Sequence, residues 1–321
     1  MKSYVLRRVL QAVVVLFLFS VALRALLDAM PGDPTLMAMF NRPNIKAEDI
    51  ARIERLYGTR DPFPVKYAKW MTMVFVKGEM GVSRSEGGRP VSELILEYSW
   101  NSLQLMSLAF ALSLAIAIPI GILAAVRQHS VVDYATGFFS FLGISIPSFW
   151  LGLMAIYLFA VWLQWLPPGG MTTIGAEGGG VSDRLHHLLL PVLVLSVQTI
   201  AVWIRYTRAS MLEVIHEDYV RTARAKGLGE GQVYGKHALR NALIPIVTLL
   251  ALSIPELFSG ALITETLFSW PGMGRLLYRS VINKDHMVAM IAFLILAALT
   301  LVCNLLADVL YAVVDPRVRL S

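Results

Sequence analysis

Charged side chains are scarce in this chain. Lysine, arginine, aspartate and glutamate make up 16% of its 321 residues, and hydrophobic residues make up 56%. A soluble globular protein usually has about 25% charged and about 45–50% apolar residues. This chain therefore has too little polar surface for a soluble fold, and its mean hydropathy of +0.63 agrees. The composition predicts a polytopic membrane protein, to which length-based estimates of domain number for soluble folds do not apply.

Cysteine and catalytic motifs are also scarce. The single cysteine, Cys303, lies in an apolar run and is interpreted as a small apolar side chain within a helix. One cysteine excludes an internal disulfide and a cysteine-based metal site. HExxH and GxSxG motifs are absent from the sequence. Adjacent His186 and His187 would point in different directions from a helix, so we expect no metal site, no catalytic residue and no cofactor in this chain.

Long apolar runs are what the chain has instead. A helix needs about 20 mostly apolar residues to cross a hydrocarbon core about 30 Å thick. We expect six spans, at about 9–29, Leu103–Val126, Tyr134–Trp162, Leu188–Tyr206, Ala242–Leu267 and Met287–Val314.

The first span has the basic start of a signal peptide. Its apolar stretch is too long, however, and the following MPGDP does not resemble a cleavage site with small residues. We therefore expect this span to be retained.

Lysine and arginine near the span ends predict the orientation. With the N-terminus in the cytoplasm, the basic residues of segments 2–8, 205–240 and 317–319 lie inside, and the short outer loops hold few. Six spans then place both termini in the cytoplasm. The net charge of +6 is explained by this topology, so we expect no nucleic acid partner.

The predicted organisation has four parts. Residues 1–29 are the cytoplasmic start and first span, 30–100 an external helical segment, 101–314 a five-helix membrane core with a cytoplasmic loop at 210–241, and 315–321 a cytoplasmic tail. The external segment holds two short amphipathic stretches, at 47–58 and 64–78. The glycine-rich stretch 172–183 is expected to be a flexible outer loop, since it does not follow a strand as a phosphate loop would.

Residues 218–245, DYVRTARAKGLGEGQVYGKHALRNALIP, form a basic segment between two apolar spans. A helix is predicted from about Glu213 to Lys226, with a favourable i,i+4 pair of Glu217 and Arg221. Gly227 should end it, because glycine takes the left-handed cap cheaply. A second helix should then run into the fifth span, with Pro245 near its start. Such a segment could be a juxtamembrane loop held by anionic lipid or a docking element for a soluble partner.

The residues favour docking. The segment resembles the cytoplasmic coupling loop of ABC importer permeases, whose core is Glu-Ala-Ala, three residues, then Gly. The corresponding positions are Arg221, Thr222, Ala223 and Gly227, of which Ala223 and Gly227 keep the pattern. The departures, together with DYVRTARAKGL followed by HALRNALIP, resemble the peptide/nickel branch and its B-type subunit.

Other stretches extend this resemblance over nearly the whole chain. LLDAMPGDP, GEMGVSRSEGGRPVSELI, ISIPSFWLGL, ETLFSWPGMGRLL and VVDPRVR occur in the order found in that branch. The resemblance implies an all-α polytopic type I importer permease fold in a prokaryotic plasma (inner) membrane. It also implies partners: a second homologous permease, two cytoplasmic ATPases that bind ATP and magnesium, and an extracytoplasmic binding protein that delivers the solute.

By the same resemblance, the coupling helix would sit in a groove on an ATPase, and the solute would be a di- or oligopeptide, with nickel or another small solute as the alternative. The residues expected to couple to the ATPase are Tyr219, Arg221, Thr222, Ala223, Arg224, Lys226 and Gly227.

Polar residues inside spans are costly and therefore suggest function. Glu256, in SIPELFSG, is either a paired or protonated glutamate among helices or a group on the translocation path that meets a cationic or amine-bearing solute. Gln198 and Asn304 are milder candidates for the path, and interhelical hydrogen bonding is their other interpretation. Arg24 and Asp28, four residues apart, are expected to form an ion pair.

Two other classes of protein fit these residues less well. An ion-coupled secondary transporter would need midplane carboxylates and often internal repeats; Glu256 is the one good candidate, and we detect no repeat. An intramembrane enzyme would need a nucleophile–base or metal constellation, which the motifs do not supply.

Overall fold

The computed structural model describes residues 2–30, 61–173, 175 and 180–314, which are almost entirely helical. The expected amphipathic stretch 47–58 and the tail 315–321 lie outside the described residues, as do residues 174 and 176–179 of the glycine-rich loop. The expected stretch 64–78 is confirmed as a helix that continues into a π-helical segment. The elements are α1 (Lys2–Ala29), α4 (Phe63–Met71), η1 (Thr72–Val76), α5 (Val91–Val126), α6 (Val131–Ser145), α7 (Ser148–Ala155), η2 (Ile156–Trp162), α8 (Val181–Ile215), α9 (Asp218–Ala225), α10 (Glu230–Gln232), η3 (Val233–Ala238), α11 (Leu239–Ser259), α12 (Leu262–Leu267), α13 (Met273–Ile282) and α14 (His286–Val314).

Several described helices are long and apolar enough to span a membrane. Helices α1, α5, α8 and α14 each contain such a stretch. The bent pair formed by α6 and the α7–η2 helix would make a fifth span if it is counted as one. The remaining expected span falls on α11, so the count of six stays a prediction.

The expected third span is not one straight helix. Its two halves meet at an angle of 96°. Ile146 between them has the extended backbone angles φ −78° and ψ 123°. The cause is Pro147, whose ring disfavours the helical conformation of the residue before it.

The expected fifth span, Ala242–Leu267, is also interrupted. Helix α11 ends at Ser259, and Gly260 takes a left-handed φ of 74° before α12 begins. Glycine allows this reversal because it has no Cβ. A Cβ there would also lie 2.7 Å from Glu265 Oε1. The turn therefore needs glycine for two reasons.

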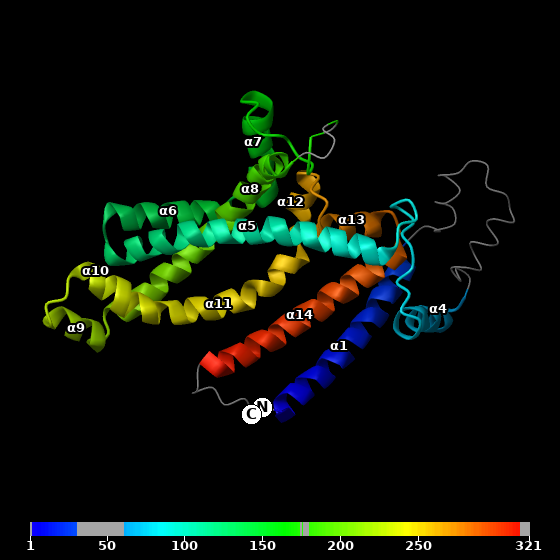
Figure 1. The fold of residues 1–321 in the computed structure, drawn as a ribbon, viewed down its shortest axis with the longest axis horizontal. Helices are drawn as coiled ribbons and strands as arrows, with labels where there is room; N and C mark the ends of the chain where they lie inside the picture. Colours follow the sequence, from blue (N-terminus) through cyan, green and yellow to red (C-terminus); the bar gives the residue numbers. More distant parts are fainter. Residues whose placement is uncertain (1, 31–60, 174, 176–179, 315–321) are drawn as a thin grey trace. The chain divides into compact units, whose positions relative to one another are not determined.

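The chain forms two compact units. The first contains residues 1–97 and 276–301, and the second contains 98–275 and 302–321. In the first unit, α1 contacts α4 (Figure 1), where the hydroxyls of Ser20 and Tyr67 are 2.7 Å apart. The expected ion pair is confirmed, because Arg24 Nε lies 3.2 Å from Asp28 Oδ1. Lys66 adds a second cation, 3.7 Å from Asp28 Oδ2.

In the second unit, α8 is the central helix. It contacts α6 on one side and α11 on another (Figure 1). Its residues Trp203 and Ile204 pack with Ala117 of α5 and Ile246 of α11 in one buried cluster. Helices α5 and α8 approach closely at Gly121, where a Cβ would lie 2.6 Å from the Cβ of Thr207. Small residues at such crossings let membrane helices pack closely.

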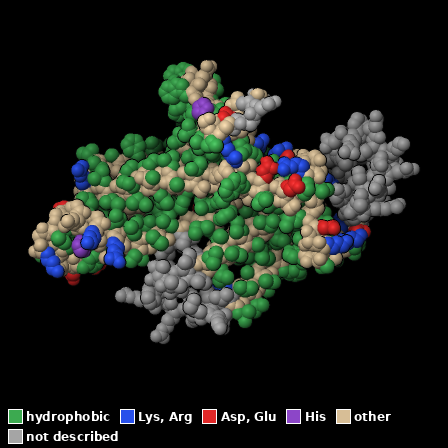
Figure 2. Space-filling view, viewed as in Figure 1, with side chains coloured by type: hydrophobic (Ala, Val, Ile, Leu, Met, Phe, Trp, Pro, Cys, Tyr) green, Lys and Arg blue, Asp and Glu red, His purple; other side chains and the backbone are tan. Residues whose placement is uncertain are grey.

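Hydrophobic side chains cover much of the described surface (Figure 2). On α6, Phe138, Phe139 and Phe141 are 64%, 65% and 73% exposed. Lysine and arginine gather over α9 and α10 (Figure 2). An apolar surface of this extent suits a lipid environment, and the basic end marks the expected cytoplasmic loop.

Candidate functional site

The coupling segment is a helical hairpin that begins where α8 ends. The expected continuous helix from Glu213 to Lys226 is wrong, because α8 stops at Ile215 and α9 starts at Asp218. Glu217 between them is extended, with φ −67° and ψ 150°. The break lets α9 fold back and bury its apolar face, which a continuation of α8 would leave in solvent.

The expected pair of Glu217 and Arg221 is replaced by a neighbouring one. Arg221 Nη1 lies 3.2 Å from Asp218 Oδ1. Glu217 is the residue before the first helical turn, so its side chain is not one turn away on the helix surface. The Arg221 and Asp218 side chains are 77% and 95% exposed, so this pair adds little stability.

The buried face of α9 belongs to a cluster that joins several helix ends. Val220 and Ala223 are 0% and 5% exposed. They pack with residues from four other elements, and each element is expected to move with α9. The partners are Ala125 of α5, Met211 and Ile215 of α8, Val233 and Ala238 of η3, and Ala242 of α11.

Arg224 connects α9 to the returning helix through Tyr234 and Glu230, and we call these three residues the clasp. Its Nη2 donates a 3.0 Å hydrogen bond to the Tyr234 hydroxyl, and its Nε lies 3.3 Å from Glu230 Oε1. The guanidinium carbon also lies 5.4 Å from the centre of the Tyr234 ring. Burial, followed by a hydrogen bond with Glu230, raises the pKa of the Tyr234 phenol, so it stays neutral at physiological pH. Sequence reasoning missed Glu230 and Tyr234, because pairing across a turn leaves no periodic signal.

The other face of α9 is open to solvent. Tyr219 is 39% exposed, and Arg221, Thr222 and Lys226 are also exposed. The seven predicted coupling residues therefore separate into an exposed set, the buried Ala223, the clasped Arg224 and the terminator Gly227.

Gly227 ends α9 as expected. Its φ is 77°, its N–H donates to the Arg224 carbonyl at 2.9 Å, and the Leu228 N–H reaches the Ala223 carbonyl at 3.4 Å. These two bonds make a Schellman motif, which favours glycine at the left-handed position. A Cβ on Gly227 would meet no atom of this chain within 4 Å. The requirement for glycine within this chain is therefore one of backbone conformation.

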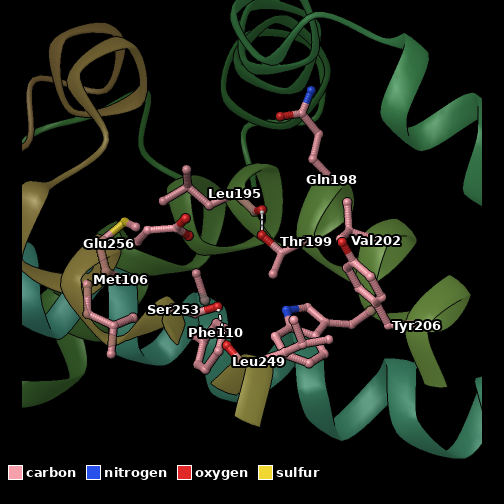
Figure 3. A pocket seen from close by; sticks show the side chains of 13 residues that line it. Met106, Phe110, Leu195, Gln198, Thr199, Val202, Tyr206, Leu249, Ser253 and Glu256 are labelled. Carbon is pink, nitrogen blue, oxygen red and sulfur yellow. Dashed lines mark hydrogen bonds between the residues drawn. The ribbon is translucent and has the colours of Figure 1, made fainter. Parts of the chain in front are cut away.

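A second candidate site is an open cavity of about 420 Å³ lined by α5, α8 and α11. Glu256 of α11 is exposed, and its side chain points into this cavity (Figure 3). Gln198 also lines it, but its Nε2 donates a 2.8 Å hydrogen bond to the Ile146 carbonyl at the bend between α6 and α7. Asn304 is exposed on α14 and is not among the residues that line the cavity. The structure thus brings Glu256 and Gln198 to one cavity and leaves Asn304 outside it.

Two polar contacts in the second unit were not foreseen. Glu265 is fully buried, and its carboxylate accepts hydrogen bonds from Ser102 Oγ at 2.6 Å, Ala261 N at 3.2 Å and Arg275 N at 3.1 Å. An acidic residue beside PGMG was the available signal. On the other side of α8, Arg208 Nε and Nη2 donate to Asp133 Oδ1 and Oδ2 at 2.6 and 2.8 Å.

The adjacent histidines face different partners. His186 Nε2 lies 2.9 Å from the Trp165 carbonyl, and His187 Nδ1 lies 2.9 Å from the Asp183 carbonyl. Among the residues that the structure describes, no group of three or more His, Cys, Asp or Glu side chains could hold a metal ion.

Two family descriptions match this chain. Residues 117–320 match the family described as "Binding-protein-dependent transport system inner membrane component", and residues 1–105 match its N-terminal counterpart. Together these matches cover both compact units.

Full-length relatives agree. The chain is 43% identical over 319 residues to the oligopeptide transport system permease protein AppB of Bacillus subtilis, covering 99% of this chain and 100% of the relative. It is 35% identical over 339 residues to the dipeptide transport system permease protein DppB of Escherichia coli K12, covering 99% of each.

The fold is also similar to that of a solved structure. An inward-facing structure of the MetNI methionine ABC transporter matches with a TM-score of 0.55 and 18% identity, covering 70% of this chain and 97% of that one. This likeness supports the predicted type I importer permease fold. The chain therefore belongs to the family of inner-membrane components of binding-protein-dependent transport systems, and it is a multi-pass permease subunit of an ABC importer.

Proposed function

We propose that the importer served by this chain takes up di- or oligopeptides. The support is the similarity over the whole length to permeases named for oligopeptide and dipeptide transport. Nickel or another small solute carried by the same mechanism is the alternative, since the resemblance extends to the peptide/nickel branch.

The assembly that we propose has the parts that the family implies. A second, homologous permease forms the path together with this chain, and an external binding protein delivers the solute. Two cytoplasmic ATPases hold ATP and magnesium, so this subunit itself performs no bond chemistry.

One observation supports α9 as the coupling element. Its exposed face presents Tyr219 and Arg221, while Val220 and Ala223 are buried among the ends of α5, α8 and α11. A partner bound to the exposed face of α9 would therefore move α5, α8 and α11, because they pack against its buried face. Such coupling requires that the ATPases bind α9 differently in two conformations of the importer.

The experiment is ATP hydrolysis by the full complex in lipid vesicles: this chain, the second permease, the two ATPases and the binding protein. We expect hydrolysis to rise when the binding protein carries a peptide. If only a nickel-loaded binding protein stimulates hydrolysis, the solute is nickel and the importer mechanism still holds. Solute uptake without any ATPase would instead indicate a secondary transporter.

The docking face has a matched control. Arg221→Glu reverses a charge on the exposed face of α9, whereas Arg127→Glu reverses one on an exposed residue after α5. Copurification of the ATPases should fall for Arg221→Glu and stay unchanged for Arg127→Glu. Equal recovery of the ATPases with both variants would contradict docking through this face.

A further inference from the structure

We propose that the cavity beside Glu256 binds the ammonium group of the transported solute, either a peptide α-ammonium or a lysine side chain. This proposal rests on the proposed peptide import and adds a chemical preference to this chain's own part of the path.

Among the described residues that line the cavity, Glu256 is the only one of a charged type. The 13 lining residues are Met106, Ala109, Phe110, Leu195, Gln198, Thr199, Val202, Trp203, Tyr206, Leu249, Ser253, Glu256 and Leu257. A carboxylate in such a setting favours a cation.

Glu256 differs from two other carboxylates of this unit, Asp133 and Glu265. Asp133 has a bidentate partner in Arg208, and Glu265 accepts three hydrogen bonds. Among the described residues, nothing donates a hydrogen bond to the Glu256 carboxylate or pairs with it, and the side chain is exposed to the cavity. A charge at membrane depth is costly without a partner. A bound cation would supply that partner.

Two hydroxyls in the lining are arranged to accept hydrogen bonds. Ser253 Oγ donates to the Leu249 carbonyl at 3.0 Å, and Thr199 Oγ1 donates to the Leu195 carbonyl at 3.0 Å (Figure 3). The hydroxyl hydrogens are thus used inside the helices, which leaves the oxygens as acceptors. Gln198 also uses its amide Nε2 to donate a hydrogen bond to the Ile146 carbonyl. An ammonium has three donors and no acceptor, so it complements this set.

Aromatic rings complete the wall. The Phe110 and Trp203 ring centres are 5.9 Å apart, and those of Trp203 and Tyr206 are 6.1 Å apart. Ring faces attract cations, with tryptophan the strongest. The volume of about 420 Å³ lies within the usual range for ligand pockets, about 300–1,000 Å³. The cavity can therefore hold a side chain or a peptide terminus together with its ammonium group.

The test uses the complete importer in vesicles and three peptides of equal length. The first has a free N-terminus and neutral side chains, the second is its N-acetylated form, and the third replaces one neutral side chain of the first with lysine. Initial uptake rates are compared at equal occupancy of the binding protein, for the parent chain and for Glu256→Gln, Glu256→Asp and Glu93→Gln. Glu93 is an exposed glutamate outside the cavity, and it controls for loss of a carboxylate.

We expect Glu256→Gln to lower uptake of the first and third peptides about tenfold, equivalent to about 1.4 kcal/mol, and to leave the acetylated peptide unchanged. Glu256→Asp should restore much of the rate, and Glu93→Gln should behave as the parent. A loss confined to the lysine peptide would assign the site to the side-chain ammonium and not the α-ammonium.

An equal loss for all three peptides, or no loss for any, would overturn the proposal. An equal loss together with poorer copurification of the second permease would show that Glu256 pairs with that subunit instead. Failure of peptide import itself is seen separately, because the parent importer would then show no ATP hydrolysis stimulated by peptide.

Discussion

Arg224 of α9 and Tyr234 of η3 are joined by a hydrogen bond of 3.0 Å from guanidinium to phenol, with Glu230 on the other side of the guanidinium at 3.3 Å. This contact connects the exposed helix expected to bind an ATPase with the helix that runs into α11. It gives the hairpin a fixed geometry beyond what the buried cluster provides.

Removing the phenol hydroxyl should loosen this connection. Tyr234→Phe keeps the ring and loses the hydroxyl that bonds to Arg224 and Glu230; a hydrogen bond to a charged group is worth about 1.5–3 kcal/mol. We expect assembly with the ATPases to persist and the number of solutes imported per ATP hydrolysed to fall. Tyr157→Phe, at a tyrosine that is 62% exposed in η2, is the control. A ratio equal to that of the parent would show that the clasp plays no part in coupling.

The pH dependence of the clasp follows from the state of Tyr234. Its pKa is raised, chiefly by burial, above a usual value of about 10. The folded protein then binds this proton more tightly than the unfolded chain does, so the stability linked to the neutral phenol is present below about pH 10 and lost as pH rises further. Between pH 6 and 9 the import profiles of the parent and Tyr234→Phe should therefore be parallel. A divergence in that range would indicate that another titrating group acts on the clasp.

Gly227 and Gly229 offer a matched pair in the turn. Neither would place a Cβ within 4 Å of another atom of this chain, but only Gly227 has a positive φ, of 77°. Gly227→Ala should cost about 1–2 kcal/mol because of its left-handed backbone, whereas Gly229→Ala should be nearly neutral. Gly227→Asn should recover part of the loss, since asparagine tolerates this conformation better. Import and ATPase copurification measure the effect, and equal results for both alanine variants would contradict it.

A larger residue at Gly227 tests the contact with the ATPase. Gly227→Glu should reduce import beyond Gly227→Ala while the protein remains in the membrane, because this chain itself leaves room for the side chain. The extra loss would then come from a partner. If both variants import at the same rate at equal expression, the backbone accounts for the whole effect and no partner packs there.

Glu265 should be critical for stability. Glu265→Ala leaves the donors of Ser102, Ala261 and Arg275 without their acceptor in a fully buried place. Each buried unsatisfied group costs about 1–3 kcal/mol, so we expect a total loss of at least about 3 kcal/mol. Ser102→Ala removes one of these hydrogen bonds and should cost less. Thermal unfolding of the detergent-purified complex measures the two losses of stability. A larger loss for Ser102→Ala than for Glu265→Ala would refute the prediction.

The pair of Asp133 and Arg208 should stabilise the packing of α6 on α8. The two side chains are 7% and 32% exposed, so the interaction is partly shielded from water. A double-mutant cycle with Asp133→Asn and Arg208→Gln should give a coupling energy of about 1–3 kcal/mol. Additive effects of the two substitutions on thermal unfolding would show that the pair is energetically neutral.

The class of the protein and the helix–turn–helix segment after α8 could both be predicted from local sequence patterns. Runs of apolar residues indicate spans because a bilayer requires about 20 of them. Gly227 marked the end of α9 because few other residues take its backbone conformation cheaply. Pro147 carried a local signal for the bend at Ile146, but the apolar run across it was interpreted as one span.

The tertiary structure decided which groups meet. The sequence placed Glu217 beside Arg221, but the fold-back of α9 onto the ends of α5, α8 and α11 made Asp218 the partner instead. The hydrogen bond from Ser102 to Glu265 joins residues 163 positions apart in the chain, and the cavity beside Glu256 brings together residues of α5, α8 and α11. Local periodicity carries no information about such contacts, because they depend on how whole helices pack rather than on the residues beside them.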